Sequence, residues 1–101
     1  MIQFSDRVVV PPHVMVRFLD QESVFLNLDT ERYFGLDKVG TRMWELLSAS
    51  PSVDAAYRQL LDEFDVAPDL LRTNLTDLLT KLQQNGLLQL VPPHVGTPTS
   101  L

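Results

Sequence analysis

Three short segments with alternating side chains follow one another so closely that only tight turns can connect them. They span residues 14–19, 23–28 and 32–36, with polar residues at 20–22 and 29–31. A side-chain period of two is typical of β-strands, whose successive side chains point to opposite faces of a sheet. Parallel neighbours would need a crossover of about a dozen residues, which these gaps exclude. The sequence therefore predicts an antiparallel three-stranded meander.

The alternation also assigns faces to the predicted strands. In the second strand, Val24, Leu26 and Leu28 make one strongly apolar face. In the third strand, Phe34 and Leu36 share a face, and we expect this face to point toward the core.

Helical periodicity replaces the alternation after residue 36. Asp37 is a suitable N-cap, because its carboxylate can accept hydrogen bonds from the free amides of a first helical turn. Ser52 occupies the same kind of position before a second periodic stretch. Pro68 suits the first position of a third helix, because it lacks only an amide that would be unpaired there anyway. The three expected helices lie within residues 37–47, 52–64 and 68–85.

The third predicted helix has the clearest pattern. Four leucines fall within about 60° on a helical wheel: Leu71, Leu75, Leu78 and Leu82. Leu70 and Leu79 lie on opposite shoulders of this stripe, and either shoulder could pack against the sheet or line a groove. Gly86 can adopt the left-handed conformation that ends a helix, which would fold Leu87 back onto Leu82.

Three strands followed by three helices are typical of an α+β fold. Because the sheet comes first and the helix bundle follows, we expect a winged helix-turn-helix-like topology. We divide the chain into an N-terminal arm (1–13), a domain (14–91) and a disordered tail (92–101). The arm is expected to be loose, although residues 8–10 could form a short strand. Residues 88–91 could add another strand before the tail.

Composition limits the classes of function. The 101 residues suit one domain with a modest core, and 45% of them are apolar, as in ordinary globular chains. The sequence has no cysteine, which excludes disulfides, thiolate catalysis and cysteine zinc sites. The formal net charge is −5 and the eight lysines and arginines are scattered, which disfavours binding to nucleic acid. Without a signal-peptide pattern or an apolar run of about 20 residues, we expect no membrane association and a cytoplasmic protein.

No group of side chains in the sequence resembles an active site. His13 and His94 lie in the two irregular ends without further ligands near them, so they do not predict a metal site. The carboxylates lie mostly on polar helix faces or turns, and the serines lack a nucleophile elbow. Gly35 and Gly40 are too isolated for a phosphate-binding loop. Trp44 is expected to anchor the core. We therefore expect no catalytic residues, no metal and no cofactor.

The third predicted strand is the feature most suggestive of function. It ends the meander, so one of its edges has no partner in the predicted sheet, and Tyr33 and Phe34 make it aromatic. Strand edges are normally protected by charge, proline or a covering segment, and here only Glu31 and Arg32 supply charge. Such an edge can bind an extended peptide through main-chain hydrogen bonds. The alternative, in which the N-terminal arm or the strand near Leu88 covers this edge, stays open.

The sequence also resembles a known family. The similar stretches are Val-Phe-Leu-Asn-Leu at 24–28, Arg-Tyr-Phe-Gly-Leu-Asp-Lys-Val-Gly-Thr-Arg-Met-Trp-Glu-Leu-Leu at 32–47, and an ending with Leu78, Leu82 and Asn-Gly-Leu-Leu at 85–88. They look like the PqqD-like family, the peptide-recognition elements of ribosomally made, modified peptides. The resemblance covers about residues 14–91. Within the family, the chain is more similar to the discrete proteins of lasso-peptide clusters than to the member of the PQQ pathway.

This resemblance implies a winged-helix fold whose third strand pairs with the leader of a precursor peptide, in a groove shared with the third helix. It implies no chemistry in this domain, which would deliver the leader to a separate leader peptidase, cyclase or radical enzyme. The residues at the family's contact positions are Glu31, Arg32, Tyr33, Phe34 and Gly35 on the strand, and Leu71, Asn74, Leu75 and Leu78 on the helix.

Two other classes of function are weighed against this one. A winged-helix DNA-binding transcriptional regulator would need a basic exposed face on its recognition helix. Between residues 69 and 86, however, Arg72 and Lys81 are balanced by Asp69 and Asp77. The second alternative is a small enzyme subunit whose site forms only at an interface. The absence of a basic face and of a catalytic set favours a peptide-binding module that is not an enzyme.

Overall fold

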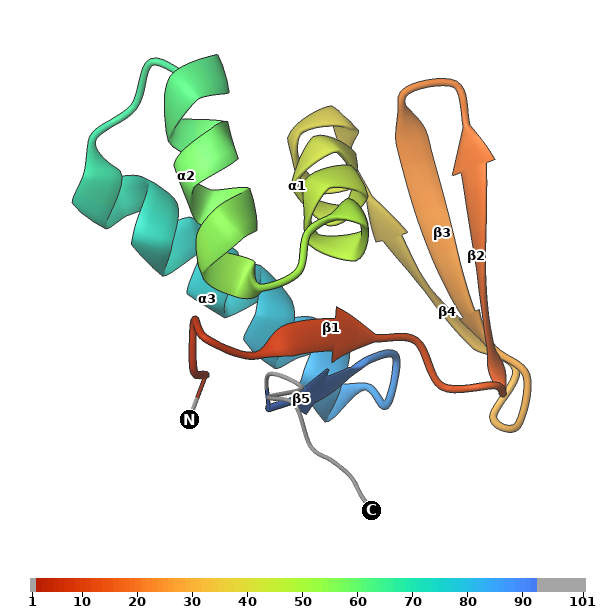
Figure 1. Cartoon of the computed structure of the whole chain (residues 1–101). Helices are drawn as coiled ribbons and strands as arrows, with labels where there is room; N and C mark the ends of the chain where they lie inside the picture. Colours follow the sequence, from red (N-terminus) through yellow and green to blue (C-terminus); the bar gives the residue numbers. More distant parts are fainter. Residues whose placement is uncertain (1, 93–101) are drawn as a thin grey trace.

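The computed structural model describes residues 2–92, and its elements follow the expected order (Figure 1). The strands are β1 (Arg7–Val9), β2 (Val14–Leu19), β3 (Glu22–Asn27), β4 (Arg32–Leu36) and β5 (Gln89–Val91), and the helices are α1 (Lys38–Ala49), α2 (Val53–Glu63) and α3 (Pro68–Gln84). An antiparallel sheet has the order β2-β3-β4, and the three helices follow it in the chain. The predicted α+β fold is confirmed.

The two hairpins of this sheet close through residues with left-handed backbone. Asp20 and Gln21 form a two-residue turn between β2 and β3, and Asp20 has a φ of 61°. Glu31, with a φ of 62°, ends the longer turn between β3 and β4. Two-residue hairpin turns require a positive φ, because only this conformation matches the right-handed twist of the flanking strands. The turns therefore fix the register of the sheet.

The face of β3 that points to the core is the less apolar of its two faces. Phe25 is fully buried against the helices, between two polar residues. On the other face, Val24 and Leu26 are half-buried and Leu28 is 49% exposed. The strongly apolar face read from the sequence is thus the outer face of the sheet.

The two buried polar residues of β3 are stable in the core because each has a hydrogen-bond partner. The hydroxyl of Ser23 lies 2.8 Å from the hydroxyl of Thr41 on α1. The Oδ1 atom of Asn27 accepts hydrogen bonds from the amides of Asp29 and Thr30, at 3.0 and 3.2 Å. Buried polar groups are costly only when they lack partners. Asn27 therefore stabilises the β3–β4 turn from a buried position.

The predicted helix starts are confirmed. The Asp37 carboxylate accepts a hydrogen bond from the amide of Gly40 at 2.8 Å, and the Ser52 hydroxyl accepts one from the amide of Ala55 at 3.1 Å. Pro68 is the first residue of α3. None of the helices within residues 2–92 is long and apolar enough to cross a membrane.

The predicted end of α3 is also confirmed. Gly86 has a φ of 69°, in the left-handed region that favours glycine. The amide of Leu87 then donates to the carbonyl of Leu82 at 2.9 Å, and the amide of Gly86 donates to that of Gln83 at 3.0 Å. This pair of bonds is a Schellman motif. It turns the chain back so that the Leu87 side chain is buried.

Aromatic rings join the sheet to the helices in the core. Trp44 of α1 is 3% exposed and meets the fully buried Phe25 edge to face, with ring centroids 4.9 Å apart. Phe34 and Leu36 share the core side of β4, as predicted. From α3 the core receives Leu71, Leu75, Leu79 and Leu82. Trp44 is therefore a core anchor, as expected.

The N-terminal residues do not form a loose arm throughout. β1 pairs antiparallel with β5, which confirms both optional short strands and corrects the expectation for residues 7–9. Before β1, the ring of Phe4 packs edge to face on Tyr57, with centroids 5.6 Å apart, and the guanidinium of Arg72 lies 4.0 Å from the centroid of the Phe4 ring. The division at residue 13 stays a prediction, and the expected tail lies, apart from Pro92, outside the described residues.

Candidate functional site

The outer edge of β4 has no strand beside it within residues 2–92. The sheet order ends at β4, and β1 and β5 pair only with each other, below α1 and α2 in Figure 1. The alternative in which one of these segments pairs with the edge of β4 is therefore wrong. The outward backbone groups of β4 therefore have no strand partner within residues 2–92.

The neighbouring strands determine which backbone groups of β4 point to this edge. Leu28 donates its amide to the carbonyl of residue 13, so Leu28 and every second residue before it direct their backbone groups toward β2. The residues between them, including Phe25, direct theirs toward β4. Phe25 pairs with Phe34, so the amide of Phe34 points inward. The backbone groups of Tyr33 and Gly35 therefore point to the free edge.

A groove runs between β4 and α3. One stretch of about 450 Å³ is lined by Phe34, Gly35 and Leu36 of β4 and by Asn74, Leu78 and Lys81 of α3. A second stretch of about 430 Å³ lies between Arg32 and Tyr33 of β4 and the residues at the end of α3. Phe34 lines both stretches, so they follow one another along β4. The groove combines a free strand edge with a helical wall.

The strand residues predicted for the site meet in this groove, with one exception. Arg32, Tyr33, Phe34 and Gly35 all line it. Glu31 lines neither stretch, because its left-handed backbone belongs to the turn before β4.

The helix residues predicted for the site divide into two pairs. Asn74 and Leu78 line the groove. Leu71 and Leu75 are 1% and 0% exposed, so their assignment to the helical wall is corrected: they belong to the core. Residues three and four apart share a helix face. The face of α3 that lines the groove, with Asn74 and Leu78, is therefore rotated by about one residue from the buried face with Leu71 and Leu75.

Exposure also distinguishes the two shoulders of α3. Leu79 is fully buried, whereas Leu70 is 54% exposed. Leu70, Asn74 and Leu78 follow one another at spacings of four, so the shoulder that contains Leu70 faces outward, although Leu70 itself lines neither stretch of the groove. The sequence left this choice open because both shoulders carry leucine.

Several groove residues were missed by sequence reasoning. The start of α1 contributes Gly40 and Met43, and α3 adds Asp77 and Lys81. The spacing of Asn74, Asp77 and Lys81 on one helix face could have indicated the last two. Nothing in the local sequence indicates that the start of α1 meets the groove, because that contact depends on how β4 leads into the helix.

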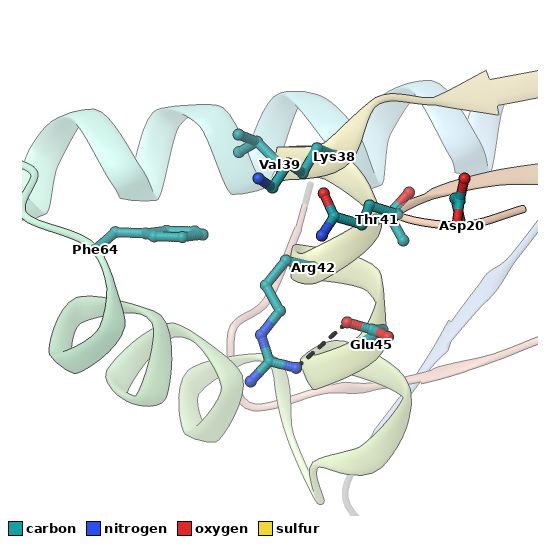
Figure 2. A pocket seen from close by; sticks show the side chains of 8 residues that line it. Asp20, Lys38, Val39, Thr41, Arg42, Glu45 and Phe64 are labelled. Carbon is teal, nitrogen blue, oxygen red and sulfur yellow. Dashed lines mark hydrogen bonds and ion pairs between the residues drawn. The ribbon is translucent and has the colours of Figure 1, made fainter. Parts of the chain in front are cut away.

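A smaller hollow of about 290 Å³ lies beside the start of α1 (Figure 2). Val39 and Phe64 line it, and the guanidinium of Arg42 bonds Glu45 at 3.3 Å and Glu63 at 2.8 Å. The hydrogen bond from Arg42 holds the pKa of Glu63 below its ordinary value. The pair with Glu63 links α1 to α2, whereas the pair with Glu45 lies within α1. The hollow is lined by the β2–β3 turn, by α1 and by Phe64 and not by β4, so it is a weaker candidate for peptide binding.

The described residues contain no group of three His, Cys, Asp or Glu side chains placed to hold a metal ion. His13 has no such neighbours, and His94 lies outside the described residues. Within residues 2–92, no buried side-chain nitrogen or oxygen lacks a hydrogen-bond partner. The lining of the groove between β4 and α3 is mixed: Phe34 and Leu78 supply apolar surface, and Arg32, Asn74 and Lys81 supply polar groups.

Residues 22–88 match the family described as Coenzyme PQQ synthesis protein D (PqqD). The match includes β3, β4 and all three helices, and so both walls of the groove. Among curated proteins, no sequence matches the chain significantly.

Two solved structures are similar to this one. TbiB1 in complex with the TbiA(beta) leader peptide is 33% identical in sequence, with a TM-score of 0.71 over 79% of this chain and 93% of that chain. Lasso peptide synthetase B1 complexed with the leader peptide is 21% identical, with a TM-score of 0.72 over 82% of this chain and 98% of that chain. The second likeness shows a shared fold. Because the family match covers residues 22–88 and TbiB1 is 33% identical, the chain belongs to the PqqD family.

Proposed function

We propose that this protein binds the leader segment of a ribosomally synthesised precursor peptide as an added strand along β4. The observation that carries the proposal is the free edge of β4 facing the exposed side of α3 across a groove. An extended peptide gains affinity from main-chain hydrogen bonds and selectivity from side-chain pockets. The structure of TbiB1, a relative of this chain, contains the TbiA(beta) leader peptide, which supports the same class of ligand here.

The proposed site consists of the outward backbone groups of Tyr33 and Gly35, the ring of Phe34, and the helical wall of Asn74 and Leu78. The leader would bind with alternate side chains directed into the groove and away from it. Glu31 and Arg32 flank the start of the strand, where they would meet the end of the bound segment. Leu71 and Leu75 support the wall from the core.

We propose that the protein presents the leader to a separate modifying enzyme, such as a leader peptidase, a cyclase or a radical enzyme, and performs no chemistry itself. Binding in this protein and chemistry in a partner agree with a groove that is lined by backbone, apolar and scattered polar groups. It would take place in the cytoplasm, where precursor peptides are synthesised.

The proposal predicts that the neighbouring genes encode a short precursor peptide, and that a synthetic peptide of its leader binds with one peptide per protein in a calorimetric titration. Hydrogen exchange should locate the contact, since the amides of Tyr33 and Gly35 point to the free edge. We expect both amides to exchange rapidly in the free protein and about tenfold or more slowly with leader bound. The inward amide of Phe34 should be protected in both states.

Two control ligands make this test specific. A scrambled peptide of the same composition should not bind, and duplex DNA should not bind at physiological salt because the net charge is −5. Equal binding of leader and scrambled peptide would contradict selective recognition. Salt-sensitive binding of DNA would instead favour the transcriptional regulator.

A second prediction concerns the side chain of Tyr33, which is 77% exposed at the edge. Tyr33→Ala should leave the melting temperature nearly unchanged and weaken leader binding by about 1–2 kcal/mol, as expected for an aromatic residue within an interface. Met15→Ala is the matched control, because Met15 lies on the same face but in β2, across Leu26 from Tyr33. A comparable loss of affinity in both variants would place the leader on the sheet face and not at its edge.

A further inference from the structure

Gly35 lies in the free edge of β4, yet the described part of the chain does not require a glycine there. A Cβ atom placed on Gly35 would meet no other heavy atom within 4 Å. Its φ is not in the left-handed region, in contrast to that of Gly86. Glycine weakens a strand interior, and one reason for its presence is the close approach of a ligand.

The bare backbone of Gly35 leaves a notch in the outer face of the sheet. Gly35 pairs with Val24, and Tyr33 pairs with Leu26. Because directly paired residues share a face, the notch is bordered by Val24 across the strand pair and by Tyr33 two residues earlier. Val24 is half-buried and the Tyr33 ring is exposed. The notch is therefore apolar at its border and open toward the position of an added strand.

We infer that this notch receives an aromatic side chain of the bound leader, from the residue that pairs directly with Gly35. The inference rests on the proposed function, because it requires an added strand. The side chain of a directly paired residue lies about 5 Å away on the same face. An aromatic ring in that position covers an edge glycine and compensates for its missing side chain. The same ring reaches Val24 and packs with the ring of Tyr33.

With the notch, both faces of the added leader strand would be recognised. Successive residues of an added strand point to opposite faces, so one set of leader side chains enters the groove beside Phe34 and Leu78. The other set lies on the outer face, where Gly35 is the one position of β4 without a side chain. The leader is thus selected by the side chains that enter the groove and independently by a single aromatic residue on the other face.

Filling the notch tests the inference. Gly35→Val should fold at least as well as the parent, because the Cβ position is open and valine favours strands. Its affinity for the encoded leader peptide should fall about tenfold, since the valine side chain occupies the place of the aromatic ring. Gly35→Ala, which adds only a methyl group, should show a smaller loss.

A double-mutant cycle separates the notch from a general disturbance of the edge. Replacing the leader aromatic by alanine should weaken binding to the parent about tenfold but add little to the loss in Gly35→Val. Alanine at the leader residue paired with Tyr33 is the control, and its effect should be the same in both proteins. Melting curves and the amide exchange of Tyr33 would verify that each variant folds and still receives the strand.

The outcomes also separate this inference from the proposed function. If the leader protects the amide of Tyr33 but binds Gly35→Val as tightly as the parent, the notch does not receive an aromatic side chain. The proposal of strand addition along β4 would still hold. The inference about the notch would also be wrong if the losses of affinity from Gly35→Val and from the leader alanine were simply additive. A leader that binds without an aromatic residue opposite Gly35 would contradict it as well. If the parent does not bind the leader at all, both proposals are wrong.

Discussion

Tyr33→Pro should leave a folded protein that no longer binds the leader, whereas Phe34→Pro should unfold the domain. Proline removes the amide donor and fixes φ, so it cannot serve as a normal residue of a strand ladder. At Tyr33 the lost amide points to the free edge and is needed only by the added strand. At Phe34 the lost amide pairs with β3, next to the fully buried Phe25. Two neighbouring substitutions of the same kind therefore have opposite consequences.

The measurements are a melting curve and a calorimetric leader titration for each variant. We expect Tyr33→Pro to melt close to the parent with affinity reduced beyond detection. Phe34→Pro should lose a large part of the roughly 5–15 kcal/mol that stabilises a domain of this size. Comparison with Tyr33→Ala separates the amide from the ring, because alanine keeps the donor. If both proline variants fold and bind as the parent does, β4 is not the docking edge.

Much of the fold follows from local sequence signals. The strands are short and their turns are tight, so only a meander fits. Asp37, Ser52, Pro68 and Gly86 mark helix ends through their own backbone or side-chain chemistry, and the structure confirms each of them. These signals act over three or four residues, which is why one sequence is sufficient to read them.

The face of β3 could not be read in the same way. Hydrophobic counting favours Val24, Leu26 and Leu28, but the buried face holds Phe25 between two polar residues. Those polar residues are tolerated because Thr41 and the β3–β4 turn supply their partners. Such partners come from distant or irregular segments, so the alternation of one strand does not reveal them.

The candidate site could be predicted only in part. The aromatic edge strand was visible in the sequence, but its exposure depended on where the short terminal strands pair. β1 pairs with β5 across about 80 residues of chain, and periodicity carries no information about such long-range pairing. On α3, Leu71, Asn74, Leu75 and Leu78 were predicted to form the wall, but only Asn74 and Leu78 line the groove. Leu71 and Leu75 are buried, because regular apolar spacing on a helix indicates its core face.

Trp44→Ala should destabilise the protein by about 3–5 kcal/mol without removing the binding site. The indole is 3% exposed, meets Phe25 edge to face, and lines neither stretch of the groove. Its loss would leave a cavity between the sheet and α1, which the surrounding side chains cannot fill. Trp44→Phe, which keeps an aromatic ring, should lose markedly less. Chemical denaturation of the three proteins measures these differences.

Leader binding distinguishes this core role from a direct contact. A ligand that binds only the folded state stabilises it by mass action, by about 2.7 kcal/mol at a concentration of 100 times Kd. Saturating leader should therefore raise the stability of Trp44→Ala and of the parent by similar amounts, because the groove is the same in both folded proteins. If Trp44→Ala melts like the parent but gains no stability from the leader, Trp44 contacts the ligand. In that case Trp44 would not be a core residue, and α1, not β4, would bind the peptide.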